Sequence, residues 1–138
     1  MGTLGSQRIT VGESAVAPEP VAVLIVDDQA PFRRAARAVV TATSGFDVVA
    51  EAESGEEAVE LADHVSPGLV LMDINLPGIN GVEATRRIVA AHPGTVVMLL
   101  STYQEADLPA DAKDCGAARY VNKEEFGPQV ILDTWADR

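Results

Sequence analysis

The sequence contains few of the residues that disulfide-linked or membrane proteins require. Cys115 is the single cysteine in 138 residues, so no internal disulfide can form. No apolar run approaches the roughly 20 residues of a membrane-spanning helix, and the N-terminus lacks the basic start and apolar core of a signal peptide. We therefore expect a cytoplasmic protein with a reduced thiol and no membrane contact.

Basic residues are also scarce. The chain has 10 Lys and Arg against 21 Asp and Glu, which gives a formal net charge of -11 at pH 7. Direct nucleic-acid binding normally requires clustered basic side chains that displace counterions from phosphates. The pairs Arg33-Arg34 and Arg86-Arg87 fall within helical patterns, and we interpret them as solvated faces. The charge balance thus argues against direct nucleic-acid binding by this chain.

The remaining composition is that of one globular domain with a short leader. Apolar residues make up 47% of the chain and charged residues 22%. Residues 1–20 are rich in Gly, Ser, Ala, Pro and Glu without a sustained period, which predicts a flexible leader. Residues 21–138 alternate about five times between short apolar runs and amphipathic segments. This alternation predicts an α/β fold, in which helices cover a parallel sheet.

The apolar runs and the helix signals place the elements. Strands are expected at 21–26, about 47–50, 69–72, 95–100 and 118–121, and a helix is expected after each of them. Ser54 with Glu57, and Asn80 with Glu83, have the spacing of helix N-terminal caps. The fourth helix, at about 107–114, contains Pro109 and few large apolar residues, so we expect it to be short and weakly anchored.

Chemically useful side chains follow four of the five predicted strands. Asp27 and Asp28 follow the first, Asp73 the third, Ser101 the fourth and Lys123 the fifth. The carboxyl ends of parallel strands form one edge of a doubly wound sheet, where functional sites lie, so these side chains should converge.

The three predicted neighbours Asp27, Asp28 and Asp73 repel one another unless a cation neutralises them. Mg²⁺ fits best, because it needs only one or two carboxylates and keeps water or phosphate oxygens as its other ligands. The Asp73 carboxylate could then attack a phosphoryl group in line, while Lys123 offsets charge on the transferring oxygens and Ser101 binds one of them afterwards.

Four motifs in this order resemble the receiver domains of bacterial two-component response regulators, in particular NarL/FixJ-like receivers. The resemblance covers nearly all of residues 21–138 and rests on VLIVDDQ (23–29), LMDINLPGINGVEATRRI (71–88), LLSTY (99–103) and YVNK (120–123). It implies a flavodoxin-like receiver fold, with five parallel strands in the order 2-1-3-4-5 and five flanking helices. Glu124 stands where the family often has a proline.

The resemblance also implies a role for each matching residue. Asp73 would be the phosphoacceptor; Asp28, Asp73 and the main-chain carbonyl of Asn75 would bind Mg²⁺ directly, and Asp27 would hold metal-bound water. Ser101 would be the switch hydroxyl and Tyr120 the aromatic that rotates inward when Ser101 engages the phosphoryl group, while Lys123 would pair with the phosphate. The family is not enzymatic beyond its own phosphorylation and dephosphorylation.

The implied partners are a sensor histidine kinase as phosphodonor and either a downstream protein or an output domain. The fourth helix, fifth strand and fifth helix would form the output surface, and a homodimer formed on phosphorylation is a further expectation. Two interpretations stay open within the class: a stand-alone regulator, or the receiver fragment of a DNA-binding transcription factor.

Two other classes share parts of this pattern. An aspartyl-phosphate phosphatase of the haloacid-dehalogenase type also uses an aspartate at a strand end, but it needs a second aspartate two residues later, where this chain has Asn75. A flavodoxin-like electron carrier needs a phosphate-binding loop after the first strand, where Asp27 and Asp28 would repel the phosphate.

Overall fold

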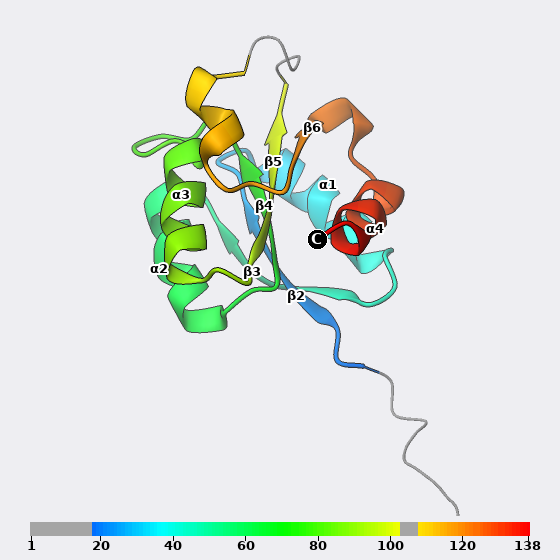
Figure 1. The fold of residues 1–138 in the computed structure, drawn as a ribbon. Helices are drawn as coiled ribbons and strands as arrows, with labels where there is room; N and C mark the ends of the chain where they lie inside the picture. Colours follow the sequence, from blue (N-terminus) through cyan, green and yellow to red (C-terminus); the bar gives the residue numbers. More distant parts are fainter. Residues whose placement is uncertain (1–17, 103–107) are drawn as a thin grey trace, which may run out of the picture.

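The computed structural model describes residues 18–102 and 108–138 as a parallel sheet covered by helices on both faces (Figure 1). Its strands are β2 (Val21–Val26), β3 (Phe46–Ala52), β4 (Leu69–Asp73), β5 (Val96–Ser101) and β6 (Arg119–Asn122). Its helices are α1 (Ala30–Thr41), α2 (Gly55–Val65), α3 (Gly81–Ala91) and α4 (Pro128–Ala136), with two short 3-10 helices, η2 (Ala110–Asp114) and η3 (Lys123–Glu125).

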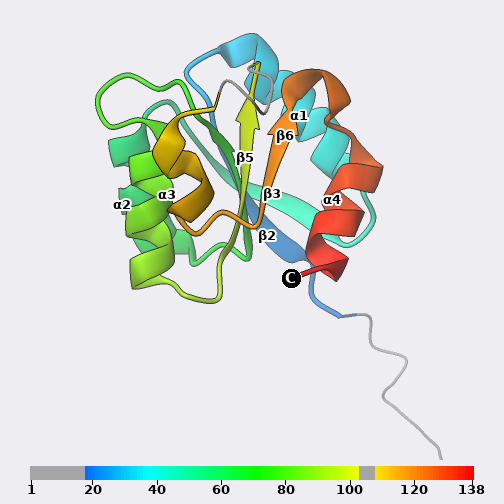
Figure 2. The ribbon, with the colours of Figure 1, turned by 45° about the horizontal axis from the view of Figure 1, so that its top comes forward.

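The sheet has the expected topology. Its strands lie in the order β3-β2-β4-β5-β6, and every neighbouring pair is parallel. In chain order this is 2-1-3-4-5, so the predicted fold class and strand order are confirmed. Figure 2 shows α2 and α3 on one face of the sheet and α1 and α4 on the other.

Each face of the sheet has its own apolar core, because successive strand residues point to opposite faces. Leu24, Met72 and Leu99 pack in the cluster that includes residues of α2 and α3. Ile25, Leu71 and Met98 pack in the cluster that includes residues of α1 and α4. All five residues of β4 are buried, as expected of a central strand covered on both sides.

Two helices begin at the predicted caps. The Ser54 hydroxyl accepts a hydrogen bond from the Glu57 amide at 3.1 Å, and the Asn80 side chain accepts one from the Glu83 amide at 2.9 Å. The Glu57 carboxylate accepts from the amide of Glu53, one residue before the cap. The Asn80 cap matters for the site, because α3 begins immediately after the loop that follows β4.

The expectation of five α-helices is wrong by one in the described part of the chain. The fourth position holds η2, a five-residue 3-10 helix in which only Ala112 is buried. Pro109 precedes it with an extended ψ of 144°, and a single buried side chain cannot anchor a longer helix. Residues 1–17 of the predicted leader and residues 103–107, which include the end of the LLSTY motif and the expected start of this helix, lie outside the described residues.

None of the described helices has both the length and the apolar composition needed to cross a membrane.

Candidate functional site

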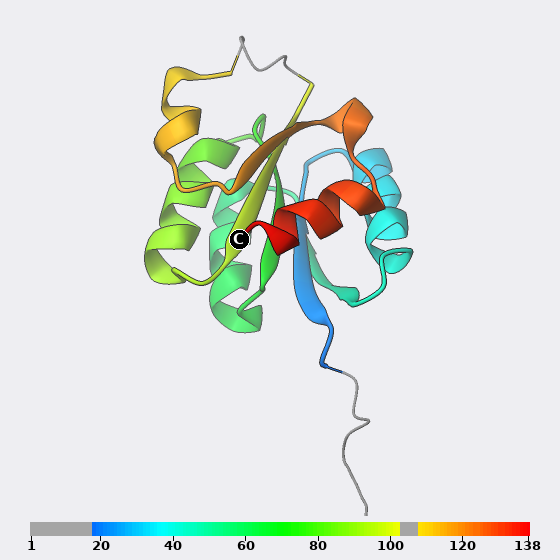
Figure 3. The ribbon, with the colours of Figure 1, turned by 45° about the vertical axis from the view of Figure 1, so that its right-hand side comes forward.

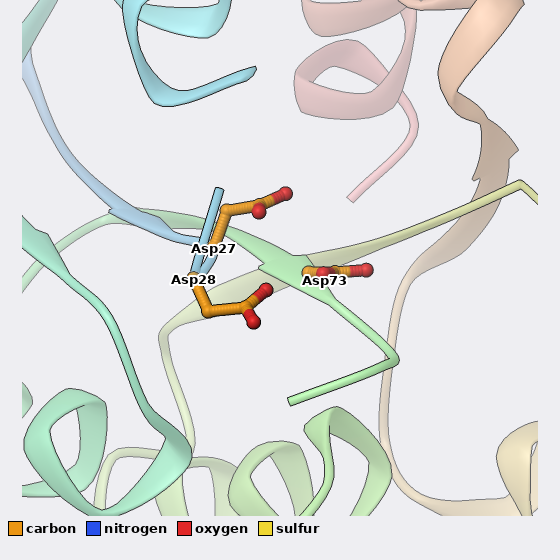
Figure 4. Close-up of side chains that lie close together, drawn as sticks. All are labelled: Asp27, Asp28 and Asp73. Atoms are coloured by element: carbon orange, nitrogen blue, oxygen red, sulfur yellow. The ribbon is translucent and has the colours of Figure 1, made fainter. Parts of the chain in front are cut away.

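Three carboxylates meet at the carboxyl ends of β2 and β4. These strands are adjacent and parallel, with Val26 opposite Met72, so Asp27 and Asp73 follow at the same level. One carboxylate oxygen each of Asp27, Asp28 and Asp73 lies within 4.8 Å of the others. Figure 4 shows the three side chains side by side, projecting in the same general direction. Asp27 and Asp73 are buried and Asp28 is exposed, so the cluster opens to solvent on one side.

Lys123 brings a positive charge to the same place from the other end of the sequence. It begins η3, directly after β6, and its ammonium lies 2.7 Å from Asp27 Oδ2 and 3.6 Å from Asp73 Oδ1. The first distance is that of a charge-assisted hydrogen bond and the second that of a looser ion pair. The ammonium therefore pairs with both buried carboxylates and is closer to Asp27.

The environment of Asp73 disfavours its charged form. Burial and the charge of Asp27 raise the pKa of Asp73 from 3.8 to about 6, while Lys123 and the Asn75 amide act in the opposite direction. That amide donates to Asp73 Oδ1 at 3.3 Å. Burial and the neighbouring carboxylates therefore outweigh the stabilisation of the charged form of Asp73 by Lys123 and the Asn75 amide.

The cluster has the chemistry of a site for a hard divalent cation. Its donors are all carboxylate oxygens, and they carry more negative charge than Lys123 neutralises. Mg²⁺ prefers such oxygen ligands and keeps part of its water shell, which the exposed side at Asp28 allows. The acidic residues predicted to hold a metal are thus brought together in a group that could hold one.

Ser101 lies at the end of β5, the strand next to β4, and Tyr120 lies on the edge strand β6. Ser101 is buried at the carboxyl end of β5, where Leu100 pairs with Asp73 and Ser101 itself pairs with Asn122. The Tyr120 hydroxyl donates a hydrogen bond to the carbonyl of Ala112 in η2. Tyr120 is thus tied to η2. A cavity of about 440 Å³ is lined by both Ser101 and Tyr120.

Arg33 is a site neighbour that the sequence interpretation missed. Its guanidinium donates to the main-chain carbonyl of Asp27 at 2.6 Å and pairs with Glu51 at 3.2 Å, and only 14% of its side chain is exposed. The interpretation of Arg33 as part of a solvated face is therefore wrong. The available signal was its place in the first turn of the helix that follows Asp27, from which a long side chain can reach back.

Arg86 and Arg87 behave as predicted. Both are about half exposed and pair with Glu83 on their own helix, at 3.0 and 2.8 Å. Arg86 also lies 3.8 Å from Asp111 of η2, which links α3 to that segment.

A five-stranded doubly wound sheet with an acidic cluster and a lysine at its carboxyl edge defines the class of receiver-like α/β domains. Comparison with known proteins agrees: the family model described as response regulator receiver domain matches residues 23–134. The chain belongs to this family, which contains the receiver domains of bacterial two-component systems.

The chain is similar to regulators of known sequence and structure. It is 38% identical to the transcriptional regulatory protein DegU of Brevibacillus brevis over 80% of this chain and 47% of DegU. The signal receiver domain of the putative response regulator NarL from Mycobacterium tuberculosis superimposes with a TM-score of 0.80 at 28% identity, covering 88% of this chain and all of that domain. A CheX-CheY-BeF3-Mg+2 complex from Borrelia burgdorferi contains a chain with a TM-score of 0.75 at 25% identity, covering 86% and 89%. The chain spans about half the length of the curated relatives it matches.

Proposed function

We propose that this chain is a phosphorylation-activated switch that accepts a phosphoryl group on Asp73. The observation that carries the proposal is the buried Asp73 carboxylate flanked by two further carboxylates and by the Lys123 ammonium. A nucleophilic carboxylate, a hard-cation site and a fixed positive charge are the parts that phosphoryl transfer requires. Membership of the receiver family supports the same function.

The proposed chemistry forms one bond and breaks one. An Asp73 carboxylate oxygen bonds to phosphorus while the bond from phosphorus to the donor's imidazole nitrogen breaks, and the departing imidazole keeps the electron pair and takes a proton from water. Asp73 must be ionised for this attack, so the proton that its raised pKa favours must leave first. Lys123 offsets the charge on the phosphoryl oxygens.

We assign the Mg²⁺ ligands to Asp28, Asp73 and the main-chain carbonyl of Asn75, with Asp27 holding metal-bound water. When bound, the cation would supply charge neutralisation for the phosphoryl oxygens and for the carboxylates. The proximity of Asp27, Asp28 and Asp73 supports this assignment. The CheX-CheY-BeF3-Mg+2 complex is a related structure whose name includes the same cation and a phosphoryl-like group.

The proposed switch works through Ser101 and Tyr120. Ser101 would turn its hydroxyl to the phosphoryl group, and the Tyr120 ring would move inward and break its hydrogen bond to Ala112 of η2. The cavity that both residues line offers room beside Ser101 for that motion. The surface of η2, β6 and α4 would then change and carry the output.

We further propose a sensor histidine kinase as phosphodonor, a downstream protein or an output domain as receiver of the signal, a homodimer on phosphorylation, and a cytoplasmic location. DegU is a transcriptional regulator, and this chain matches about half of it. The chain's own chemistry would be limited to gaining and losing the phosphoryl group, so we assign no other enzymatic activity. Residues 21–138 are proposed as the receiver domain and 1–20 as a leader.

Mass spectrometry after incubation with Mg²⁺ and a small-molecule phosphodonor tests the proposal. We expect one acid-stable, base-labile phosphoryl adduct that is absent from Asp73→Asn and present in Asp47→Asn, a matched control at an exposed aspartate on β3. Failure of the wild-type protein to form an adduct, or an adduct that survives Asp73→Asn, would overturn the assignment.

A further inference from the structure

An aromatic ring from α1 lies against the site lysine. The Lys123 ammonium is 4.4 Å from the centre of the Phe32 ring, over its face. Figure 3 shows α1 and the segment around η3 side by side at one end of the sheet, although more than 80 residues of sequence separate them. An ammonium at this distance is attracted by the negative face of an aromatic ring.

The ring itself is held from a second direction. Phe32 packs against Phe126, with ring centres 6.2 Å apart and planes at 46°. Both rings are partly buried against the apolar cluster that includes residues of α1 and α4. Packing therefore holds the Phe32 ring in position. A lysine side chain has several rotatable bonds and loses substantial entropy when it is held in one place, so it needs such a contact to stay there.

The ring contact complements the two ion pairs of Lys123. Asp27 at 2.7 Å is the close partner, and Asp73 at 3.6 Å is the looser one. A divalent cation in the cluster would weaken both ion pairs, because it neutralises the same carboxylates. The attraction of the ammonium to the Phe32 ring does not depend on those carboxylates and would remain.

We propose that Phe32 is a positioning residue: its ring holds the Lys123 ammonium at the acidic cluster, and so favours a phosphoryl group on Asp73. The inference rests on the proposed function, which assigns Lys123 to that group. Phe32 itself would not touch the phosphoryl group and acts through Lys123 alone.

The test compares three variants in the presence of Mg²⁺. Phe32→Leu keeps an apolar side chain but removes the ring, and Phe32→Tyr keeps the ring. Phe126→Leu removes the ring-ring packing but keeps the Phe32 ring that contacts Lys123. Two quantities are measured for each: the affinity for beryllium fluoride, a non-covalent phosphoryl analogue, and the NMR shifts of the Lys123 ε-methylene protons, which report their distance from an aromatic ring.

We expect Phe32→Leu to weaken beryllium fluoride binding by about three- to tenfold and to remove the ring-induced shift of Lys123. Phe32→Tyr should stay within about twofold of wild type, because it keeps the ring that attracts the ammonium. Phe126→Leu removes one support of the Phe32 ring but not the ring itself, so it should lose less affinity than Phe32→Leu and keep the ring-induced shift of Lys123, even if its melting temperature falls. Wild-type affinity in Phe32→Leu, or an equal loss in Phe126→Leu, would overturn the inference while the proposed function stands. A wild-type protein that does not bind beryllium fluoride would overturn the proposed function itself.

Discussion

Gly81 lies directly against the main-chain carbonyl of Asp73: a β-carbon built on Gly81 would fall 2.1 Å from that oxygen. Gly81 opens α3, and its amide donates to the Ile74 carbonyl at 2.9 Å, so the loop after β4 folds back onto the strand that carries Asp73. No side chain fits at this contact without a shift of the Asp73 backbone.

The first prediction follows from that contact. Gly81→Ala should lower the free energy of unfolding by about 2 kcal/mol or more, because the overlap is with backbone, which cannot turn aside as a side chain can. It should also slow phosphorylation by displacing Asp73. Gly94→Ala is the control, since no atom of the residues that the structure describes lies within 4 Å of its added carbon. Urea denaturation of both variants checks the prediction, and equal stabilities would contradict it.

The second prediction concerns pH and Asp73 in metal-free protein. The pKa of Asp73 rises from its ordinary value of 3.8 to about 6 on folding, so between these values the folded state binds a proton that the unfolded chain has released. The protonated Asp73 therefore makes its whole stabilising contribution to the free energy of unfolding below about pH 4. This contribution is lost as pH rises through about 6.

Asp73→Asn cannot ionise, so it should become more stable than wild type above about pH 6, by about 1 to 3 kcal/mol. Urea denaturation in EDTA at about pH 4.5 and about pH 7.5 measures the difference. A difference that is the same at both pH values would contradict the raised pKa of Asp73. Saturating Mg²⁺ should remove the advantage of the variant at the higher pH, because the cation favours the charged carboxylate.

The third prediction separates cation binding from phosphoryl binding. Lys123→Met should bind Mg²⁺ at least as well as wild type, because the ammonium competes for the Asp27 and Asp73 carboxylates. The variant should accept a phosphoryl group at least roughly tenfold more slowly, because no ammonium is left to offset the charge on the phosphoryl oxygens. Titration calorimetry and phosphorylation rates measure the two effects. Lys113→Met, at the other lysine of the chain and exposed on η2, is the control; parallel losses in both assays for Lys123→Met would argue against the separate role of Lys123.

The fourth prediction concerns Arg33. Arg33→Met should weaken Mg²⁺ binding by about tenfold, because it frees the carbonyl of Asp27 and so loosens the loop that carries two carboxylates. Arg37→Met is a matched control: Arg37 pairs with the same Glu51 at 2.6 Å, but it is half exposed and lies one helical turn further along α1 from Asp27. If both variants lose affinity equally, the shared partner Glu51 rather than the Asp27 carbonyl is responsible.

The fifth prediction concerns the link from Tyr120 to η2. Tyr120→Phe removes the hydrogen bond to the Ala112 carbonyl and should cost about 1 kcal/mol of stability. The loss should be local, because η2 has one buried side chain to hold it. A loss of that size should make hydrogen exchange of the η2 amides several-fold faster. The amides of α3 serve as an internal reference. Unchanged exchange in η2 would show that Tyr120 does not hold this segment.

Most of the sheet and the acidic part of the site were predictable from the sequence. Central parallel strands are buried on both faces, so β2, β4 and β5 have to be continuous apolar runs, and these stand out from their surroundings. The aspartates that end two of these runs must then lie at one edge, because parallel strands share their direction. Ser54 and Asn80 were recognisable as caps because capping depends on residues only three positions apart.

Tertiary structure alone decided which side chains touch across elements. Lys123 and Asp27 are 96 residues apart, and nothing local in the sequence makes Asp27 rather than Asp73 the closer partner of the ammonium. The contact of Phe32 with Lys123 and the reach of Arg33 to the Asp27 carbonyl depend on how α1 packs on the sheet, which local spacing does not encode. The sequence by itself thus determined the strands and the acidic edge, while packing between distant elements decided how the charges at that edge are paired.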